Sequence, residues 1–138
     1  MEFAQLADYL ETKPDASEPV CVASFPGTWV NSNPDTTSIA RLEISESGGN
    51  LWLRAFAIGP DGLIDWGLTD VKVFTAGPSA RTGAGFTSAY DFGFAETRMQ
   101  AMIMKGLLVL TQFHSFKDGS KRSNYFVREY FGLDHGRF

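Results

Sequence analysis

The feature that most constrains the fold is an alternation of apolar and polar residues that begins near residue 27 and continues almost to the end of the chain. In the stretch "SIARLEIS", Ala40, Leu42 and Ile44 alternate with Arg41 and Glu43. A period of two is typical of strands that bury one face, because successive side chains point to opposite sides of a strand. Eight strands are therefore predicted, at residues 28–31, 38–45, 50–58, 67–75, 85–92, 97–104, 107–116 and 123–131.

Short turns separate most of these segments. The stretches "SGGN", "GPDG", "KG" and "KDGS" are rich in residues that accept a positive φ, as tight hairpins require. After position 27 no run of ten or more residues has a helical pattern that could cross over between parallel strands. The sequence thus predicts an all-β fold, an eight-stranded antiparallel up-and-down β-barrel, because closure removes exposed strand edges. A two-sheet sandwich is the alternative.

The first residues have a different period. Phe3, Leu6 and Leu10 recur at spacings of three and four, and Pro14 forbids continuation of a helix. A short helix over 2–12 is therefore expected, followed by a linker, with the barrel domain over residues 21–138 and the helix and linker over 1–20. Such a short helix is marginal alone, so we expect its apolar stripe to cover one mouth of the barrel or its wall.

The stretch "GTWVN" (27–31) followed by seven meandering strands resembles the opening of the calycin barrels, namely lipocalins, fatty-acid-binding proteins and avidins. Gly27 and Trp29 match the Gly-x-Trp motif that opens the first strand in those families. The resemblance implies that Trp29 is buried at one end of a lipocalin-like barrel. It also implies a basic residue near the end of the last strand against the indole, for which Arg128 is the candidate.

Charge and composition exclude several classes of function. The formal net charge of −4 and the absence of a basic run disfavour nucleic acid as a partner. No apolar run is long enough to span a membrane, and the start of the chain has no secretory pattern, so a cytoplasmic protein is expected. The single Cys21 excludes an internal disulfide and a cysteine-built metal site. No nucleotide or metal motif is present, so no cofactor is expected, and a homodimer remains open.

An eight-stranded barrel is either filled by side chains or holds one small ligand. Several positions expected to face inward carry small residues, and others carry large aromatic ones. Small residues opposite aromatic ones favour an aromatic-lined cavity, although close packing is the alternative. The small residues are Ala40, Ala55, Ala57, Gly67 and Ala101, and the expected cavity walls are Phe86, Tyr90, Phe92 and Phe113.

Polar residues on the same strands are candidates for orienting a ligand or for catalysis. Tyr90 and His114 are the candidate catalytic residues, since a phenol and an imidazole can exchange a proton with a substrate. Phe113 and His114 cannot both face inward on a regular strand, and His114 could equally lie on the surface. The other candidate ligand-binding residues are Gln112, Arg54, Tyr125 and Glu129, of which Arg54 could instead lie on the outer face and Tyr125 and Glu129 could form an exposed stripe.

Three functions fit these features. The first is an intracellular barrel that binds a small hydrophobic or aromatic molecule, for example in a biosynthetic pathway. The second is a cofactor-independent cyclase or isomerase that folds a polyketide- or polyene-like substrate in the barrel. The third is a protein-interaction module with a filled barrel.

Overall fold

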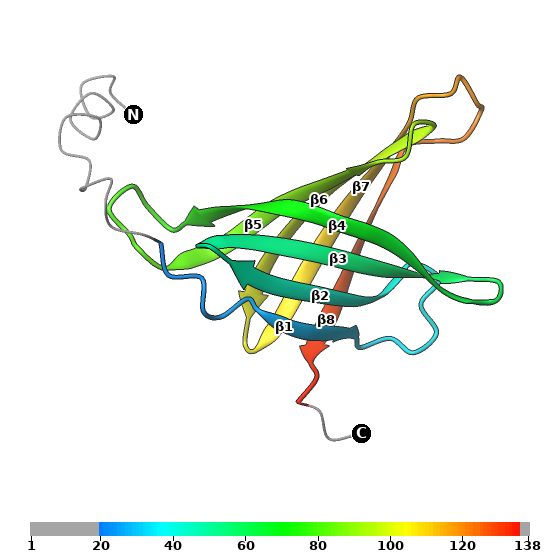
Figure 1. The fold of residues 1–138 in the computed structure, drawn as a ribbon. Helices are drawn as coiled ribbons and strands as arrows, with labels where there is room; N and C mark the ends of the chain where they lie inside the picture. Colours follow the sequence, from blue (N-terminus) through cyan, green and yellow to red (C-terminus); the bar gives the residue numbers. More distant parts are fainter. Residues whose placement is uncertain (1–19, 136–138) are drawn as a thin grey trace, which may run out of the picture.

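The computed structural model describes residues 20–135 and consists of one closed, all-antiparallel β-barrel (Figure 1). Neighbouring strands pair in chain order, and β1 pairs with β8 to close the cylinder. The predicted up-and-down barrel is confirmed, and the sandwich alternative is excluded. The predicted helix over 2–12 lies outside the described residues. The strands are β1 Gly27–Asn31, β2 Ile39–Ser47, β3 Asn50–Gly59, β4 Gly62–Thr75, β5 Gly83–Asp91, β6 Ala95–Met104, β7 Leu107–Phe116 and β8 Tyr125–Leu133.

Irregularities in the strand register shift the alternation that the sequence suggests, two of them next to the site described below. β4 begins at Gly62, five residues earlier than predicted. Its register against β3 shifts between Arg54 and Phe56, and Gly67 at this point adopts a φ of 90°. This β-bulge interrupts the period of two and hides the first part of the strand from a pattern search.

A second bulge lies in β2, where the register against β3 shifts between Ile39 and Arg41. Ile39 is completely buried, whereas Ala40 is only partly so, which corrects the expectation that Ala40 faces the interior. Asn31 donates a hydrogen bond from Nδ2 to the Ile39 carbonyl at 2.9 Å. The side chain thereby satisfies a backbone acceptor at the bulge.

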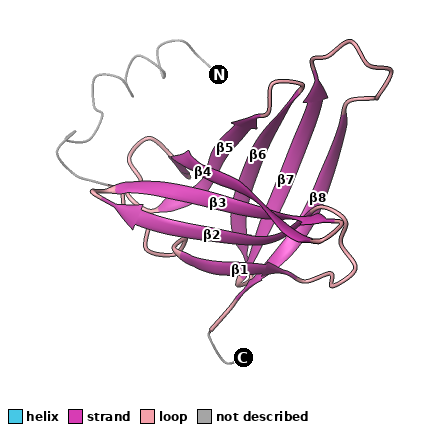
Figure 2. Ribbon diagram, turned by 45° about the vertical axis from the view of Figure 1, so that its right-hand side comes forward, coloured by secondary structure: helices cyan, strands magenta, loops and turns pink. Residues whose placement is uncertain are grey.

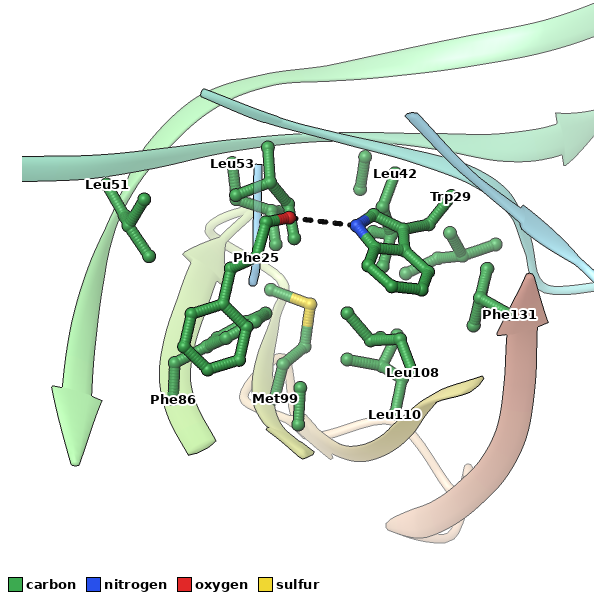
Figure 3. Close-up of a cluster of buried hydrophobic side chains, with 14 of the residues drawn as sticks. Phe25, Trp29, Leu42, Leu51, Leu53, Phe86, Met99, Leu108, Leu110 and Phe131 are labelled. Carbon is green, nitrogen blue, oxygen red and sulfur yellow. Dashed lines mark hydrogen bonds between the residues drawn. The ribbon is translucent and has the colours of Figure 1, made fainter. Parts of the chain in front are cut away.

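One half of the barrel interior is filled by apolar side chains (Figure 3). Trp29 is 2% exposed, and its indole N–H donates to the Phe25 carbonyl at 2.9 Å. Phe25 in turn packs edge-to-face on Phe86, with ring centroids 5.4 Å apart. The predicted burial of Trp29 is therefore confirmed. The fully buried apolar side chains around this cluster include Leu42, Leu51, Leu53, Met99, Leu108, Leu110 and Phe131.

The predicted contact between Arg128 and Trp29 is wrong. Glu129 and Phe131 occupy inward positions on β8, so Arg128, one residue before Glu129, points outward. Its Nε donates to the Thr111 hydroxyl at 3.2 Å on the outer surface. The two-residue period of the strand thus keeps Arg128 away from the indole.

The other half of the barrel opens. The ladder between β4 and β5 is confined to Lys72–Thr75 on β4, and beyond it the two strands separate. Side chains then bridge the gap, because the Ser88 hydroxyl donates to the Asp70 carbonyl at 2.7 Å and the Thr69 hydroxyl donates to the Ala89 carbonyl at 2.9 Å. Figure 2 shows β5 to β8 running steeply across the direction of β1 to β4. We call this end the mouth and the filled end the closed half.

Candidate binding site at the mouth of the barrel

The mouth is formed by four connections that the up-and-down topology brings to one end. They are the β1–β2 loop (32–38), the β3–β4 turn, the β5–β6 turn (92–94) and the β7–β8 loop (117–124). Inward-facing side chains of the adjoining strand ends lie below them. Several of these side chains are only partly buried, whereas the inward-facing rings of the closed half, Trp29, Phe86 and Phe131, are buried.

Three rings from β4, β5 and the start of the β5–β6 turn form one wall of the mouth. Trp66 contacts Tyr90 and Phe92 edge-to-face, with centroids 5.4 and 5.0 Å away. Tyr90 and Phe92 are stacked at 5.9 Å with an angle of 10° between their planes. Such edge-to-face and offset contacts fix ring orientation. Tyr90 is buried, whereas Trp66 and Phe92 are partly exposed and are the rings of this wall that a ligand can reach.

The Tyr90 hydroxyl has backbone partners on two strands. It donates to the Gly67 carbonyl at 2.7 Å and accepts a hydrogen bond from the Ala55 N–H at 3.0 Å. Both partners belong to the β3–β4 bulge, where the regular ladder leaves backbone groups unpaired. Burial is the main cause that raises the pKa of Tyr90 to about 12, so the phenol stays protonated at neutral pH. The Tyr90 hydroxyl thus bridges backbone groups of β3 and β4 that the bulge leaves without ladder partners.

His114 lies on the opposite wall and faces inward. Its Nδ1 is 2.8 Å from the Thr97 hydroxyl on β6, and its ring stacks on Tyr125 of β8 at 4.6 Å. Burial lowers the pKa of His114, which favours the neutral imidazole. A neutral ring with one nitrogen held by Thr97 is well oriented to exchange a hydrogen bond or a proton through Nε2.

Below His114 lies a group of polar side chains that we call the polar floor, namely Thr36, Ser38, Gln112 and Glu129. Gln112 is completely buried, and its Nε2 is 3.2 Å from the Ser38 hydroxyl. Glu129 accepts a hydrogen bond from the Thr36 hydroxyl at 2.7 Å through Oε2. Its other oxygen, Oε1, is buried and has no hydrogen-bond partner among the described residues. Such an unpaired buried acceptor is costly, so it is an obvious place for a donor from a bound molecule.

The register of β7 and β8 explains why these groups share one side. Leu110 pairs with Glu129, Gln112 with Val127, and His114 with Tyr125. Every second residue on each strand faces inward. Along β7 toward the mouth, the inward-facing residues therefore change from the apolar Leu110 to Gln112 and then to His114, which stacks on Tyr125.

The rim of the mouth is fixed by the β7–β8 loop. The Arg122 guanidinium lies 4.3 Å from the Phe116 ring centroid and 5.4 Å from that of Phe94, and it pairs with Asp118 at 2.6 Å. Lys117 also binds Asp91 at 2.7 Å. These contacts tie the β7–β8 loop to the β5–β6 turn across the end of β6 and β7.

The structure brings together some of the residues expected from the sequence and separates others. Gln112, His114, Tyr125 and Glu129 face the interior near the mouth, as does Phe92. Phe86 belongs to the closed half, where it packs on Phe25.

Two further candidates lie outside the barrel. Phe113 lies on the outer surface against Phe126, with centroids 6.1 Å apart, because His114 takes the inward position beside it. Arg54 also lies outside, 3.3 Å from Asp65.

Several residues at this site were not predicted. Thr97 continues the inward series of Met99 and Ala101 by one step, so the alternation itself could have revealed it. Thr36 lies in the β1–β2 loop, outside any periodic pattern, and Ser38 was expected only as the first residue of a strand, one residue before β2 begins. Within residues 20–135 no group of three or more histidine, cysteine or acidic side chains could hold a metal ion, and no helix has the length and apolarity to cross a membrane.

Comparison with known proteins gives no relative from which a function could be transferred. No protein-family model matches the chain, and neither the curated proteins nor the solved structures compared with it give a match. The functional argument therefore starts from the geometry of the mouth.

Proposed function

We propose that this protein binds a small aromatic molecule in the mouth of its barrel, in the manner of a calycin-type carrier. The observation that carries the proposal is the partial exposure of inward-facing rings at one end only. Trp66 and Phe92 face inward yet are partly exposed, whereas Leu53 and Leu110 deeper in the barrel are completely buried. Large rings that line an open interior favour a flat apolar ligand through stacking and area burial.

The polar floor narrows the chemistry of the ligand. A hydroxyl, amide or amine on the ligand could donate to Glu129 Oε1, the buried oxygen that lacks a partner. A charge-assisted hydrogen bond of this kind is stronger than one between neutral groups. We therefore propose an aromatic or polyene-like molecule that carries at least one hydrogen-bond donor.

A titration with aromatic compounds that differ only in their donor group tests this proposal. Binding is followed through quenching of tryptophan fluorescence, since Trp66 lies in the wall of the mouth. Glu129→Gln is expected to weaken binding of the donor-bearing compound at least tenfold, which corresponds to about 1.4 kcal/mol. Glu96→Gln is the matched control, because Glu96 lies on the outer face of β6 against Arg98. Equal affinities for both variants contradict the role given to Glu129.

One observation favours a second candidate function, a cofactor-independent isomerase or cyclase. His114 is oriented by Thr97, and its lowered pKa keeps the imidazole neutral and able to accept a proton. In that case His114→Gln should lower the turnover rate roughly a hundredfold while leaving binding nearly unchanged. If the protein is a carrier, the same variant alters affinity alone.

A further inference from the structure

The outer surface of the barrel has an apolar groove that the proposed function does not use. Its volume is about 530 Å³, and it crosses the outer face from β4 to β8. The register explains its composition, since five outward-facing residues pair successively across the five strands. This apolar rung consists of Phe74, Gly85, Met102, Val109 and Tyr130.

The groove has no side chain over β5, because the residue there is Gly85. A Cβ atom at this position would lie 2.7 Å from the Ala101 carbonyl oxygen, so a larger residue does not fit without a shift of the backbone. The larger side chains on both sides remain open to solvent, with Phe74 at 47%, Met102 at 45% and Tyr130 at 47% exposure. An exposed apolar stripe of this size indicates a docking surface.

A polar rung runs beside the apolar one, formed by Lys72, Thr87, Gln100, Thr111 and Arg128 in register across the same strands. Its two ends are cationic, and it has no carboxylate. A partner for this surface should thus present an apolar face about as long as the groove and an acidic face beside it.

Residues 1–19 of the same chain have these properties. The sequence predicts an apolar stripe of Phe3, Leu6 and Leu10 on a helix over 2–12. The segment has one basic residue, Lys13, against Glu2, Asp8, Glu11, Asp15 and Glu18. Its formal charge of −4 therefore equals the formal net charge of the whole chain.

The length and attachment of the segment also fit. A helix over 2–12 is about 16 Å long, and the rung across five strands spans roughly 19 Å. The described chain starts at the edge of the groove, since the Cys21 N–H donates to the Arg81 carbonyl and the Gly83 N–H donates to the Cys21 carbonyl. Gly83 is two residues before Gly85. Residues 13–19 can extend roughly 23 Å, which is enough to place the helix along the rung.

We propose that the N-terminal segment, residues 1–19, docks on this outer groove, with Leu6 and Leu10 on the apolar rung and its carboxylates toward Lys72 and Arg128. The segment then covers the barrel wall and leaves the mouth open.

Amide chemical shifts of the full chain test the docking. Leu6→Glu should shift the amides of groove residues such as Met102, Val109 and Tyr130. The amides of Thr97 and His114 at the mouth should stay unchanged. Shifts at the mouth, or no shifts in the barrel, overturn the proposal. Shift changes that grow with protein concentration overturn it as well, because they show that a second copy occupies the groove.

Two double-mutant cycles, measured through the thermal midpoint Tm, give an independent test. Leu6→Glu and Met102→Glu should each lower Tm, and the double variant should lose clearly less than the two separate losses combined. Leu68→Glu is the matched control, because Leu68 is an exposed apolar residue on β4 outside the groove. With Leu68→Glu the losses should be additive. Additive losses for both pairs overturn the docking.

Discussion

The closed half and the mouth of this barrel are built from the same strands, yet the inward-facing residues of the closed half are apolar and tightly packed, whereas those of the mouth include polar groups. In the closed half, Trp29, Phe86 and Leu110 pack against one another and leave no polar group to serve a ligand. Toward the mouth, the next inward positions on β7 and β8 carry Gln112, His114 and Tyr125. At the same end β4 separates from β5. The same alternation thus places buried apolar side chains toward one end of β7 and β8 and polar and aromatic side chains toward the other.

The largest change in stability is expected when a tryptophan of the closed half, Trp29, is compared with one of the mouth, Trp66. Trp29→Ala should lower the free energy of unfolding by about 3–5 kcal/mol, because it leaves a cavity among buried side chains. Trp66→Ala should cost clearly less, since Trp66 is already partly exposed. Denaturant unfolding measures both. Similar losses for the two variants would contradict the distinction between a packed half and an open one.

Tyr90 lies at the boundary between the halves. Tyr90→Phe removes the acceptor of the Ala55 N–H and the donor to the Gly67 carbonyl, so we expect a loss of about 1–3 kcal/mol. Tyr130→Phe on the outer surface is the control and should change stability little.

The pH dependence of stability provides a second measurement on Tyr90. Its folded-state pKa of about 12 lies above the value of about 10 in the unfolded chain. The unfolded state therefore loses this proton first, and the contribution of Tyr90 to stability, complete below pH 10, should be lost as pH rises from 10 toward 12. Tyr90→Phe should remove this part of the pH profile. An unchanged profile in the variant contradicts the assignment.

His114 should produce a smaller pH effect of opposite direction. Burial lowers its folded-state pKa below the usual value near 6.5, so on acidification the unfolded state takes up this proton first. Stability should therefore fall as pH drops below about 6.5. Unfolding curves of the wild type and of His114→Gln between pH 7 and pH 5 measure this, and the variant should show the weaker dependence.

The smallest effect is expected on the outer surface. The ion pair of Arg54 with Asp65 is exposed, so Arg54→Gln should change stability by at most about 0.5–1 kcal/mol. Ligand binding in the mouth should be unaffected, because Arg54 lies outside the barrel. A marked loss of affinity in this variant would place the ligand elsewhere.

Much of the barrel could be predicted from the sequence because hairpin turns and the period of two are local signals. All eight strands were expected, whereas the face of β7 that points inward stayed open, because both Phe113 and His114 were candidates for the interior. The bulges could not be predicted in the same way. At Ile39 and at Gly67 one additional residue shifts the phase, and the register across the sheet that causes the shift is a tertiary property.

The candidate site was predictable in part for the same reason. Gln112, His114, Tyr125 and Glu129 lie at alternate positions on two adjacent strands, so a single choice of face places all four. Phe113 could not be placed until that choice was made. The contacts of Thr36 with Glu129 and of Thr97 with His114 join distant parts of the sequence, and only the closed barrel shows them.

The central claim is that the mouth, and not the closed half, holds a small molecule. Native mass spectrometry of the protein purified from the cells that produce it tests this claim most directly. The account predicts one co-purifying small molecule per chain, lost in Trp66→Ala and in Glu129→Gln but retained in the surface control Leu68→Ala. A wild-type protein that carries no small molecule, or a bound molecule that persists in both mouth variants, would contradict the account.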